Sequence, residues 1–218
     1  MALLVGCGDD PSAECGAPGT ICTWAGTGVA AFDGDGKPLT QSALYWPLDL
    51  EFAPDGVPYV LDWQNHRVRQ VADGKFRTII GGDLPGDGPL SGPADMTPAG
   101  APGVDVLLNH PTDIQFLPDG TLVLAAWHNH KIRTWDPATG RVHVLCGAGG
   151  GDNAAHVPAS RALLNQPKSV ALLTTGGQTS IFVADSRNQR IRVIGPDSII
   201  DTFAGNGRQA FAGDGGPL

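Results

Sequence analysis

The side chains with the clearest chemical potential lie in a short segment that occurs three times, at residues 62–69, 126–133 and 185–192. The first two copies carry His66, His128 and His130 in predicted turns, and neutral imidazole is the commonest metal ligand among side chains. Two histidines from one copy and a third from the other could bind a transition metal. The alternative is that they pack and hydrogen-bond within their own copy of the repeat. We prefer this alternative because the residues lie in turns, and we predict no metal and no cofactor.

A second candidate is the Asp-Gly-Asp-Gly sequence at residues 33–36, which resembles the start of a calcium-binding loop. A helix-flanked calcium loop needs oxygen ligands at positions 1, 3 and 5 and a bidentate acid at position 12. Here Lys37 and Leu44 occupy the last two of these positions. Gly-Asp-Gly recurs at residues 86–88 and 213–215, which indicates a structural loop. The sequence also has no nucleophile elbow and no dinucleotide-binding glycine motif.

The repeated segment is part of a longer unit that has three copies. Each copy opens on a proline and an alternating apolar run, which has the period of a β-strand. A turn and a second apolar run come next, followed by the repeated segment. A third run and a fourth run complete the copy, and the fourth run ends in glycine. The copies span residues 47–81, 111–147 and 167–205, and the connections between them vary in length. Repeats of four short antiparallel strands with variable connections are typical of β-propeller blades.

Residues 21–26 repeat only the last strand of this unit. We therefore expect an all-β partial propeller over residues 21–218, with one extra strand and three four-stranded blades at about 47–82, 111–147 and 167–206. In a closed propeller the first and last blades cover each other's apolar faces. Open flanks predict either self-association of two chains or a fragment of a longer protein, and we favour the fragment.

The repeats resemble those of NHL-repeat β-propeller proteins over nearly the whole chain. The resemblance lies in Asn-His-Arg-Val at residues 65–68, Thr-Phe-Ala-Gly at 202–205 and Gly-Asp-Gly-Gly-Pro at 213–217. It implies a ring of about six blades, of which this chain would supply about half. The copies differ at two signature positions, where Ala126 replaces an Asp and Gln189 replaces a His. These differences weaken the expectation that every copy binds in the same way.

One face of the predicted propeller is the candidate binding surface. The turn between the second and third strands of a blade lies on the same face as the link to the next blade. Two of these turns carry Trp, which adds contact area and a hydrogen-bond donor. The alternative is that these Trp side chains pack beneath the long connections. The candidate binding residues are Trp63, Asn65, His66, Trp127, His128, Asn129, His130, Arg187 and Asn188.

Three functions follow from the resemblance. We prefer a non-enzymatic binding or scaffold module for a protein or an envelope glycan or peptide. The second is a metal-dependent hydrolase or lyase, lactonase-like or amidating-lyase-like, which would need inward-facing acids, amides or histidines from several blades. We find no set of inward-facing acids that repeats across the blades, and fold alone does not imply activity. The third is a purely structural part of a larger propeller.

Charge and cysteine content bear on partners and location. The net charge of −8 argues against nucleic acid and against an anionic membrane surface. Cys7 ends a Leu-Val-Gly-Cys sequence that resembles a bacterial lipobox, so residues 1–20 are expected to be a lipid-anchored tether in the bacterial envelope. The alternative is that Cys7 occurs by chance in a disordered tail. Cys15 and Cys22 could form a disulfide, which is typical of an oxidising compartment. Cys146 is expected to be a buried apolar residue.

Overall fold

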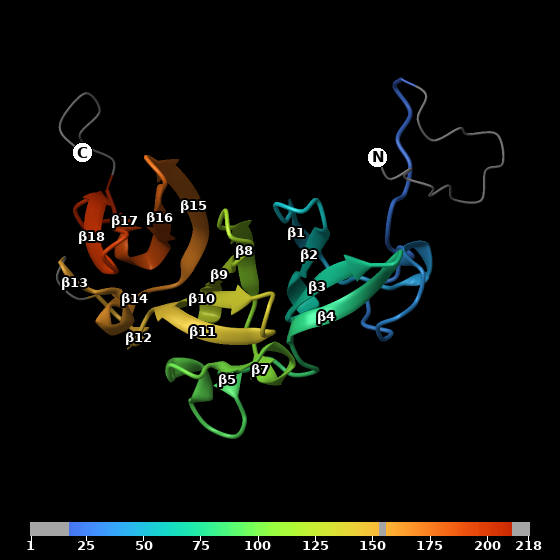
Figure 1. Ribbon diagram of the computed structural model, residues 1–218, viewed down its shortest axis with the longest axis horizontal. Helices are drawn as coiled ribbons and strands as arrows, with labels where there is room; N and C mark the ends of the chain where they lie inside the picture. The colour runs from blue at the N-terminus through green and yellow to red at the C-terminus, as the bar shows by residue number, and fades with distance from the viewer. Residues whose placement is uncertain (1–17, 153–155, 211–218) are drawn as a thin grey trace.

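The structure is a computed structural model that describes residues 18–152 and 156–210. Its main body is three antiparallel sheets, or blades, that fan out side by side with their first strands innermost (Figure 1). Blade 1 consists of β1 (Pro47–Phe52), β2 (Pro58–Asp62), β3 (Arg67–Ala72) and β4 (Lys75–Gly81). Blade 2 consists of β8 (Pro111–Phe116), β9 (Leu122–Ala126), β10 (Lys131–Asp136) and β11 (Arg141–Cys146). Blade 3 consists of β15 (Pro167–Thr175), β16 (Gln178–Asp185), β17 (Arg190–Ile194) and β18 (Ile199–Ala204). The predicted partial propeller with three four-stranded blades is confirmed.

The strands form where apolar residues alternate, and they end where the predicted turn residues occur. In β8, Ile114 is fully buried, whereas the polar residues on either side of it are only partly buried. The turn after β8 is closed by the Thr121 N–H group, which donates to Asp119 Oδ1 at 2.9 Å. Gly120 in this turn has a φ of 87°. The Pro-Asp-Gly sequence therefore forms the turn for the expected reason, since Asp accepts a local N–H and Gly accepts a positive φ.

The signature turn is a short 3-10 helix in every blade: η2 (Trp63–Asn65), η5 (Trp127–Asn129) and η7 (Ser186–Asn188). The residue after it is left-handed, with φ of 54° at His66, 57° at His130 and 49° at Gln189. The glycine that closes the fourth run packs against this residue. A Cβ atom added to Gly81 would lie 2.2 Å from the His66 carbonyl oxygen, and one added to Gly147 would lie 2.3 Å from the His130 carbonyl oxygen. Close backbone approach therefore explains the closing glycine.

The connections that precede the three blades have more regular backbone structure than their sequences suggest. Each contains a proline followed by a 3-10 turn, namely η1 (Leu39–Gln41), η4 (Gly103–Asp105) and η6 (Ala159–Arg161). Two connections add a short strand to the outer edge of the following blade, β6 (Ala101–Pro102) on β11 and β13 (Val157–Pro158) on β18. The other short elements are η3 (Ala94–Met96), β5 (Gly88–Pro89) paired with β7 (Val106–Leu107), and β12 (Gly149–Gly150) paired with β14 (Leu163–Leu164). The structural repeat therefore includes part of the connection.

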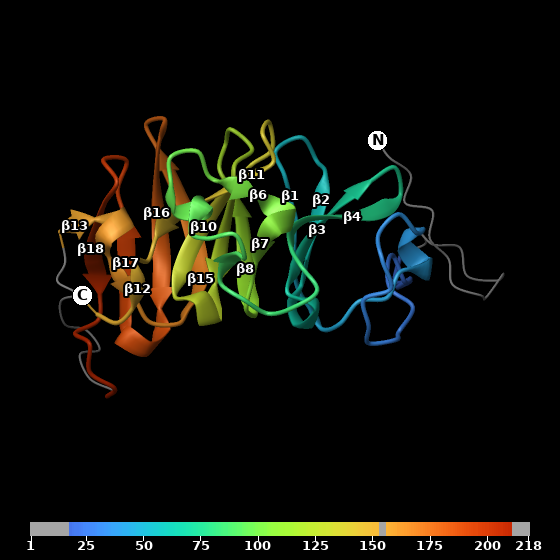
Figure 2. The same cartoon turned by 90° about the horizontal axis from the view of Figure 1, so that it is seen from below.

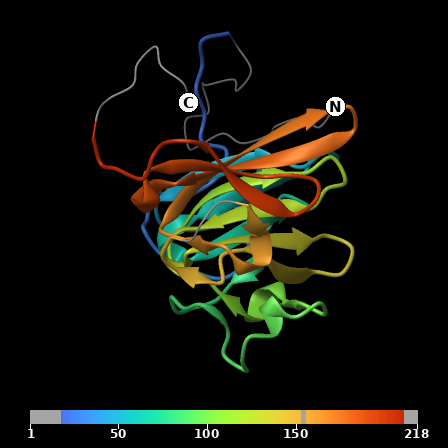
Figure 3. The same cartoon turned by 90° about the vertical axis from the view of Figure 1, so that its left-hand side faces the viewer.

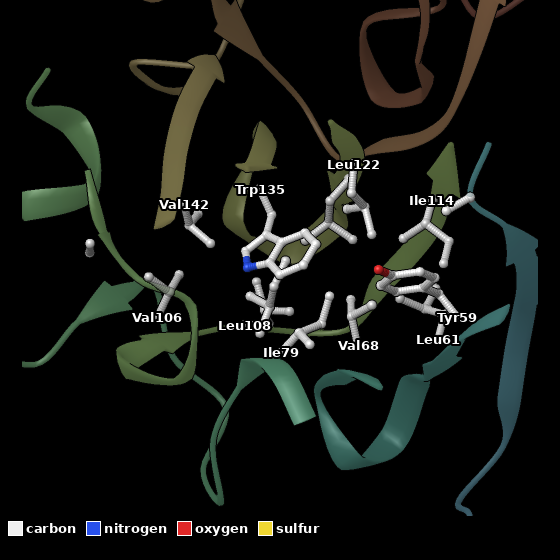
Figure 4. Packing of buried hydrophobic residues seen from close by; sticks show 14 residues of the cluster. Tyr59, Leu61, Val68, Ile79, Val106, Leu108, Ile114, Leu122, Trp135 and Val142 are labelled. Carbon is white, nitrogen blue, oxygen red and sulfur yellow. The ribbon is translucent and has the colours of Figure 1, made fainter. Parts of the chain in front are cut away.

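The core lies between the blades, which stack against one another (Figures 2 and 3). Between blades 1 and 2, Tyr59 and Leu61 pack with Ile114 and Trp135 (Figure 4). A second cluster joins blades 2 and 3. Burying one such side chain contributes about 1.5–3 kcal/mol. Each blade therefore depends on its neighbour for burial.

Blades 1 and 3 also carry exposed apolar side chains. On β1, Leu48 and Phe52 are 54% and 59% exposed, and Phe203 on β18 is 47% exposed. The extra strand expected at residues 21–26 is not formed, and this part of the prediction is wrong. Ile21 is 98% exposed, and no described strand pairs with the segment, so its backbone has no ladder to join.

The cysteines follow the sequence predictions as far as the structure describes them. Cys146 is a buried free thiol, and burial raises its pKa to about 12. Cys22 is disulfide-bonded. Cys15, its predicted partner, and Cys7, the predicted lipidation site, lie outside the described residues, as does most of the predicted tether. Among residues 18–152 and 156–210, no helix has the length and apolar character that crossing a membrane requires.

Candidate functional site

The most distinctive site is an open groove that crosses all three blades. It has a volume of about 900 Å³. We call it the tryptophan groove, and it is lined by Trp46, Pro47, Leu48, Asp49, Trp63, Thr112, Asp113, Trp127, Lys168 and Ser169. Two of the nine predicted contact residues, Trp63 and Trp127, line it. The other eight groove residues were not predicted as contact residues.

Three Trp rings form a row along the groove. The Trp46 and Trp63 centroids are 5.5 Å apart with planes 17° from parallel, and the Trp63 and Trp127 centroids are 6.5 Å apart with planes 24° from parallel. Aromatic pairs at such centroid distances prefer offset stacking to a face-to-face sandwich. Each ring is therefore only partly covered by the next. The Lys168 ammonium lies 4.9 Å from the Trp127 centroid.

Trp46 is the most exposed ring of the row, at 65%. Its φ is 52°, a left-handed conformation that is unusual for a bulky residue. His110 and Gln166, which also precede the first proline of a blade, share this conformation at 53° and 54°. The backbone conformation therefore belongs to the repeat, whereas the Trp side chain is particular to blade 1. A large exposed ring at a position that holds His and Gln in the other blades is therefore not required by the repeat.

The signature histidines link each blade to the next. The His110 N–H donates to His66 Nδ1, and the Gln166 N–H donates to His130 Nδ1, both at 3.1 Å. The predicted hydrogen-bonding role is therefore observed, but the bonds run between blades and not within one. His128 completes a cluster, with its Nδ1 atom 3.2 Å from His110 Nδ1. Burial, followed by the charges of neighbouring His110 and Arg67, lowers the pKa of His66 to about 4.

The signature Asn residues hold the connections to the blades. The Asn65 and Asn188 amides donate to the carbonyl oxygens of Ala31 and Gly151. In blade 2, Asn129 makes the same type of bond to Gly86, at 2.7 Å. These amides are engaged with backbone groups and do not line the groove. Exposed Arg187 and the half-buried His130 do not line it either.

Blade 2 compensates for the Asp that is missing at its signature turn. In blades 1 and 3, Asp62 and Asp185 accept the N–H groups of Tyr45 and Asn165. Ala126 cannot do so. Asn129 Oδ1 accepts the corresponding N–H, that of Asn109, at 3.0 Å. The substitution therefore preserves the contact through a neighbouring side chain.

The Gly-Asp-Gly loops bind fully buried arginines of the third strands. Arg69 pairs with Asp35 at 3.0 Å, and Arg133 pairs with Asp87 at 2.7 Å. Arg133 also pairs with buried Asp95 at 3.1 Å. These contacts support the structural interpretation of the loops. Among the described residues, no group of three or more His, Cys, Asp or Glu side chains is arranged to hold a metal ion.

Two acids, Asp49 and Asp113, line the groove and were not among the residues predicted from the sequence. Asp49 Oδ2 accepts the Ile114 N–H at 2.9 Å, and Asp113 Oδ2 accepts the Val170 N–H at 2.7 Å. Each acid therefore links its own inner strand to the next blade. Burial, reinforced by the charge of Asp49, raises the pKa of Asp113 to about 6. The signal was available, since both acids lie two residues after the first proline of their blades, where blade 3 has Ser169.

Comparisons with known proteins agree with the repeat structure. No family model matches the chain. The chain is 33% identical over 183 residues to Protein SUPPRESSOR OF QUENCHING 1, chloroplastic, of Arabidopsis thaliana, covering 80% of this chain and 17% of that protein. It is 26% identical over 202 residues to NHL repeat-containing protein 2 of Bos taurus, covering 88% of this chain and 26% of that protein.

A solved structure is also similar, that of an auxiliary nutrient binding protein from Bacteroides thetaiotaomicron. The TM-score is 0.50 at 18% identity, over 77% of this chain and 36% of the other. The chain spans only about a quarter or less of the length of the two curated relatives, from Arabidopsis thaliana and Bos taurus. The blade architecture, the signature turns and these similarities together identify the chain as a member of the NHL-type β-propellers.

Proposed function

We propose that the chain is a non-enzymatic binding module and that the tryptophan groove is its ligand site. The observation that carries this proposal is the row of offset Trp rings with 65% exposed Trp46 at its end. Large aromatic surfaces in a concave site supply most of the contact area in ligand recognition, and a few polar groups supply specificity. The ligand is a protein segment, or an envelope glycan or peptide.

The polar groups of the groove support binding in preference to catalysis. Asp49 and Asp113 each accept a backbone N–H from the next blade, and Asp113 also accepts the Ser169 hydroxyl at 2.7 Å. A carboxylate held in this way has fewer lone pairs free for proton transfer. These contacts give both acids a structural role, since each one links two neighbouring blades.

One observation favours a second candidate, a hydrolase or lyase. The raised pKa of Asp113 beside Asp49 is the type of perturbation that general acid–base sites use, and it occurs in a groove. In this alternative Asp113 would act as the acid, and its removal would abolish turnover without abolishing binding.

We also propose an extracytoplasmic location, with lipid anchoring through Cys7. The disulfide at Cys22 supports export because disulfides persist in oxidising compartments.

The experiment uses the chain's own repeat to design its variants. Ser186 occupies the position of Trp63 and Trp127 in a turn of the same type, so Trp63→Ser and Trp127→Ser are compatible with the local fold. Calorimetric titration would compare the wild type and both variants against soluble oligosaccharides and short peptides. Each probe is then recovered and weighed by mass spectrometry.

The proposal predicts that one class of probe binds with 1:1 stoichiometry and is recovered unchanged. Loss of either ring should weaken binding by about thirtyfold, since a central aromatic anchor contributes about 2 kcal/mol. Conversion of the probe would favour the hydrolase or lyase. Unchanged affinity in both variants would contradict the proposed site.

A further inference from the structure

We propose that the ligand of the tryptophan groove is a neutral oligosaccharide, which stacks on Trp46 and Trp63 and hydrogen-bonds to Asp49, Asp113 and Lys168. This inference rests on the proposed function and adds the chemical class of the ligand. It follows from the geometry of the rings and from the balance of charges around them.

The ring geometry suits flat, stiff ligands that have apolar faces. Neighbouring rings are close to parallel and are offset, so they present a stepped surface and not a closed stack. A pyranose ring has a face of C–H groups that packs on such a step, while its hydroxyls point sideways. Each centroid spacing combines the separation of the ring planes with the sideways step from one ring to the next. One sugar can therefore stack on the exposed face of Trp46 while its neighbour lies on the step toward Trp63.

Trp46 provides the open end of this surface. Trp63 stacks on it, and Tyr45 forms a T-shaped pair with it, the Tyr45 and Trp46 centroids being 6.0 Å apart. Nothing in the repeat requires Trp here, because Gln166 adopts the same left-handed backbone at the corresponding position of blade 3. An exposed indole that is fixed in place loses little conformational entropy when a ligand stacks on it.

The charges favour a neutral ligand. The groove contains two carboxyl groups and one ammonium group, and Lys168 forms no ion pair with either acid among the described residues. Burial and the charge of Asp49 raise the pKa of Asp113 to about 6, so the net charge of these three groups lies between zero and −1 near that pH. A cation would meet Lys168, and an anion would meet Asp49 and Asp113. A neutral ligand with many hydroxyls can donate hydrogen bonds to the acids and accept one from the lysine, and it has no like-charge repulsion with any of them.

The chain as a whole also disfavours polyanions. Its net charge is −8, so a nucleic acid or an acidic polysaccharide would be repelled before it reached the groove. A cationic peptide is the competing occupant, since aromatic faces and carboxylates also attract ammonium groups. The experiment must therefore separate neutral from cationic ligands of the same shape.

The probes are hexasaccharides that form matched sets. Cellohexaose, maltohexaose, mannohexaose and N-acetylated chitohexaose are neutral, hexaglucosamine is the cationic counterpart of chitohexaose, and hexagalacturonate is an anion. Binding to the full chain is measured by calorimetry and by intrinsic Trp fluorescence at pH 6.5. Trp46→Gln copies the residue at position 166, and Leu84→Ala removes an equally exposed apolar side chain outside the groove.

We expect at least one neutral hexasaccharide to bind with 1:1 stoichiometry and more tightly than both charged probes. Trp46→Gln should weaken it about tenfold or more, and Leu84→Ala should leave it unchanged. Lys168→Met should reduce this affinity and increase the affinity for hexaglucosamine, because the competing ammonium is gone.

Other outcomes overturn the inference. Tighter binding of hexaglucosamine than of chitohexaose, or failure of every neutral probe to bind, would exclude a neutral sugar. If a peptide then binds and Trp46→Gln weakens it, the groove remains the ligand site and only the ligand class is wrong. If no ligand of any class responds to Trp46→Gln, Trp63→Ser or Trp127→Ser, the proposed function fails as well.

Discussion

Replacing Asp113 by Asn tests the protonation of the groove, because the expected gain in the free energy of unfolding depends on pH. The pKa of Asp113 is raised from 3.8 to about 6 by burial and by the neighbouring charge of Asp49. The folded state therefore binds a proton more readily than the unfolded chain between these two values. Stability contributed by this group is present at low pH and is lost as the pH rises through about 6.

The size of the effect follows from the pKa difference. One pKa unit corresponds to about 1.4 kcal/mol, so ionised Asp113 destabilises the folded state by at most about 3 kcal/mol. Asp113 is only half-buried, and solvent screening reduces this to about 1–2 kcal/mol. Asn can still accept the Val170 N–H and the Ser169 hydroxyl, and its amide can donate to Asp49. The variant therefore imitates the protonated acid at every pH.

Urea unfolding followed by Trp fluorescence would measure this effect. Asp113→Asn should raise the free energy of unfolding by about 1–2 kcal/mol at pH 7.5 and by little at pH 4.0. Asp49→Asn is the matched variant, since it removes the same repulsion. The double variant should gain less than the sum of the two. An equal gain at both pH values, or a loss at pH 7.5, would refute the explanation.

Three further predictions concern the links that hold the blades and connections together. His66 has a folded pKa of about 4 against 6.5 in the unfolded chain, so stability should fall by up to about 3 kcal/mol between pH 6.5 and 4. His66→Gln, which copies Gln189, should flatten that part of a pH titration of the melting temperature. Gly147→Ala should cost more than about 2 kcal/mol in urea unfolding, because its Cβ would lie 2.3 Å from the His130 carbonyl oxygen. Gly140→Ala, with a φ of 67° and no atom within 4 Å, should cost only about 1 kcal/mol. Arg133→Met should cost about 3–5 kcal/mol by leaving buried Asp95 without its partner, whereas exposed Arg77→Met should change the thermal midpoint little.

The blades were predictable because their signals are local. Alternating apolar residues, Pro-Asp-Gly turns and closing glycines each determine a short stretch of backbone, and three copies make the pattern recognisable. The predicted strand at residues 21–26 had the same local signal but failed, because a strand also needs a neighbour to pair with. Local signals therefore identify a blade only when its partner strands are present.

The groove was less predictable because it depends on how blades meet. Trp63 and Trp127 were found because they repeat in the signature turn. Trp46 was missed because its counterparts are His110 and Gln166, so no repeat marks it. Asp49 and Asp113 were missed because a register shift after the first proline of each strand changes the simple alternation of the inner strand.

The sequence also did not indicate that one residue can take over a hydrogen bond that another residue makes in the other blades. Ala126 appeared to lose a signature contact, but Asn129 accepts the same N–H from the adjacent turn. Such compensation depends on three-dimensional proximity and on which atoms remain free. The repeat alone does not report either.

The most direct test of the central claim is a nuclear magnetic resonance titration of the five indole N–H signals of the full chain with a bound hexasaccharide. If the tryptophan groove is the ligand site, the signals of Trp46, Trp63 and Trp127 shift and saturate together. Trp135, which lies in the core between blades 1 and 2, should not move. Saturable binding that leaves the three groove signals in place would contradict the account.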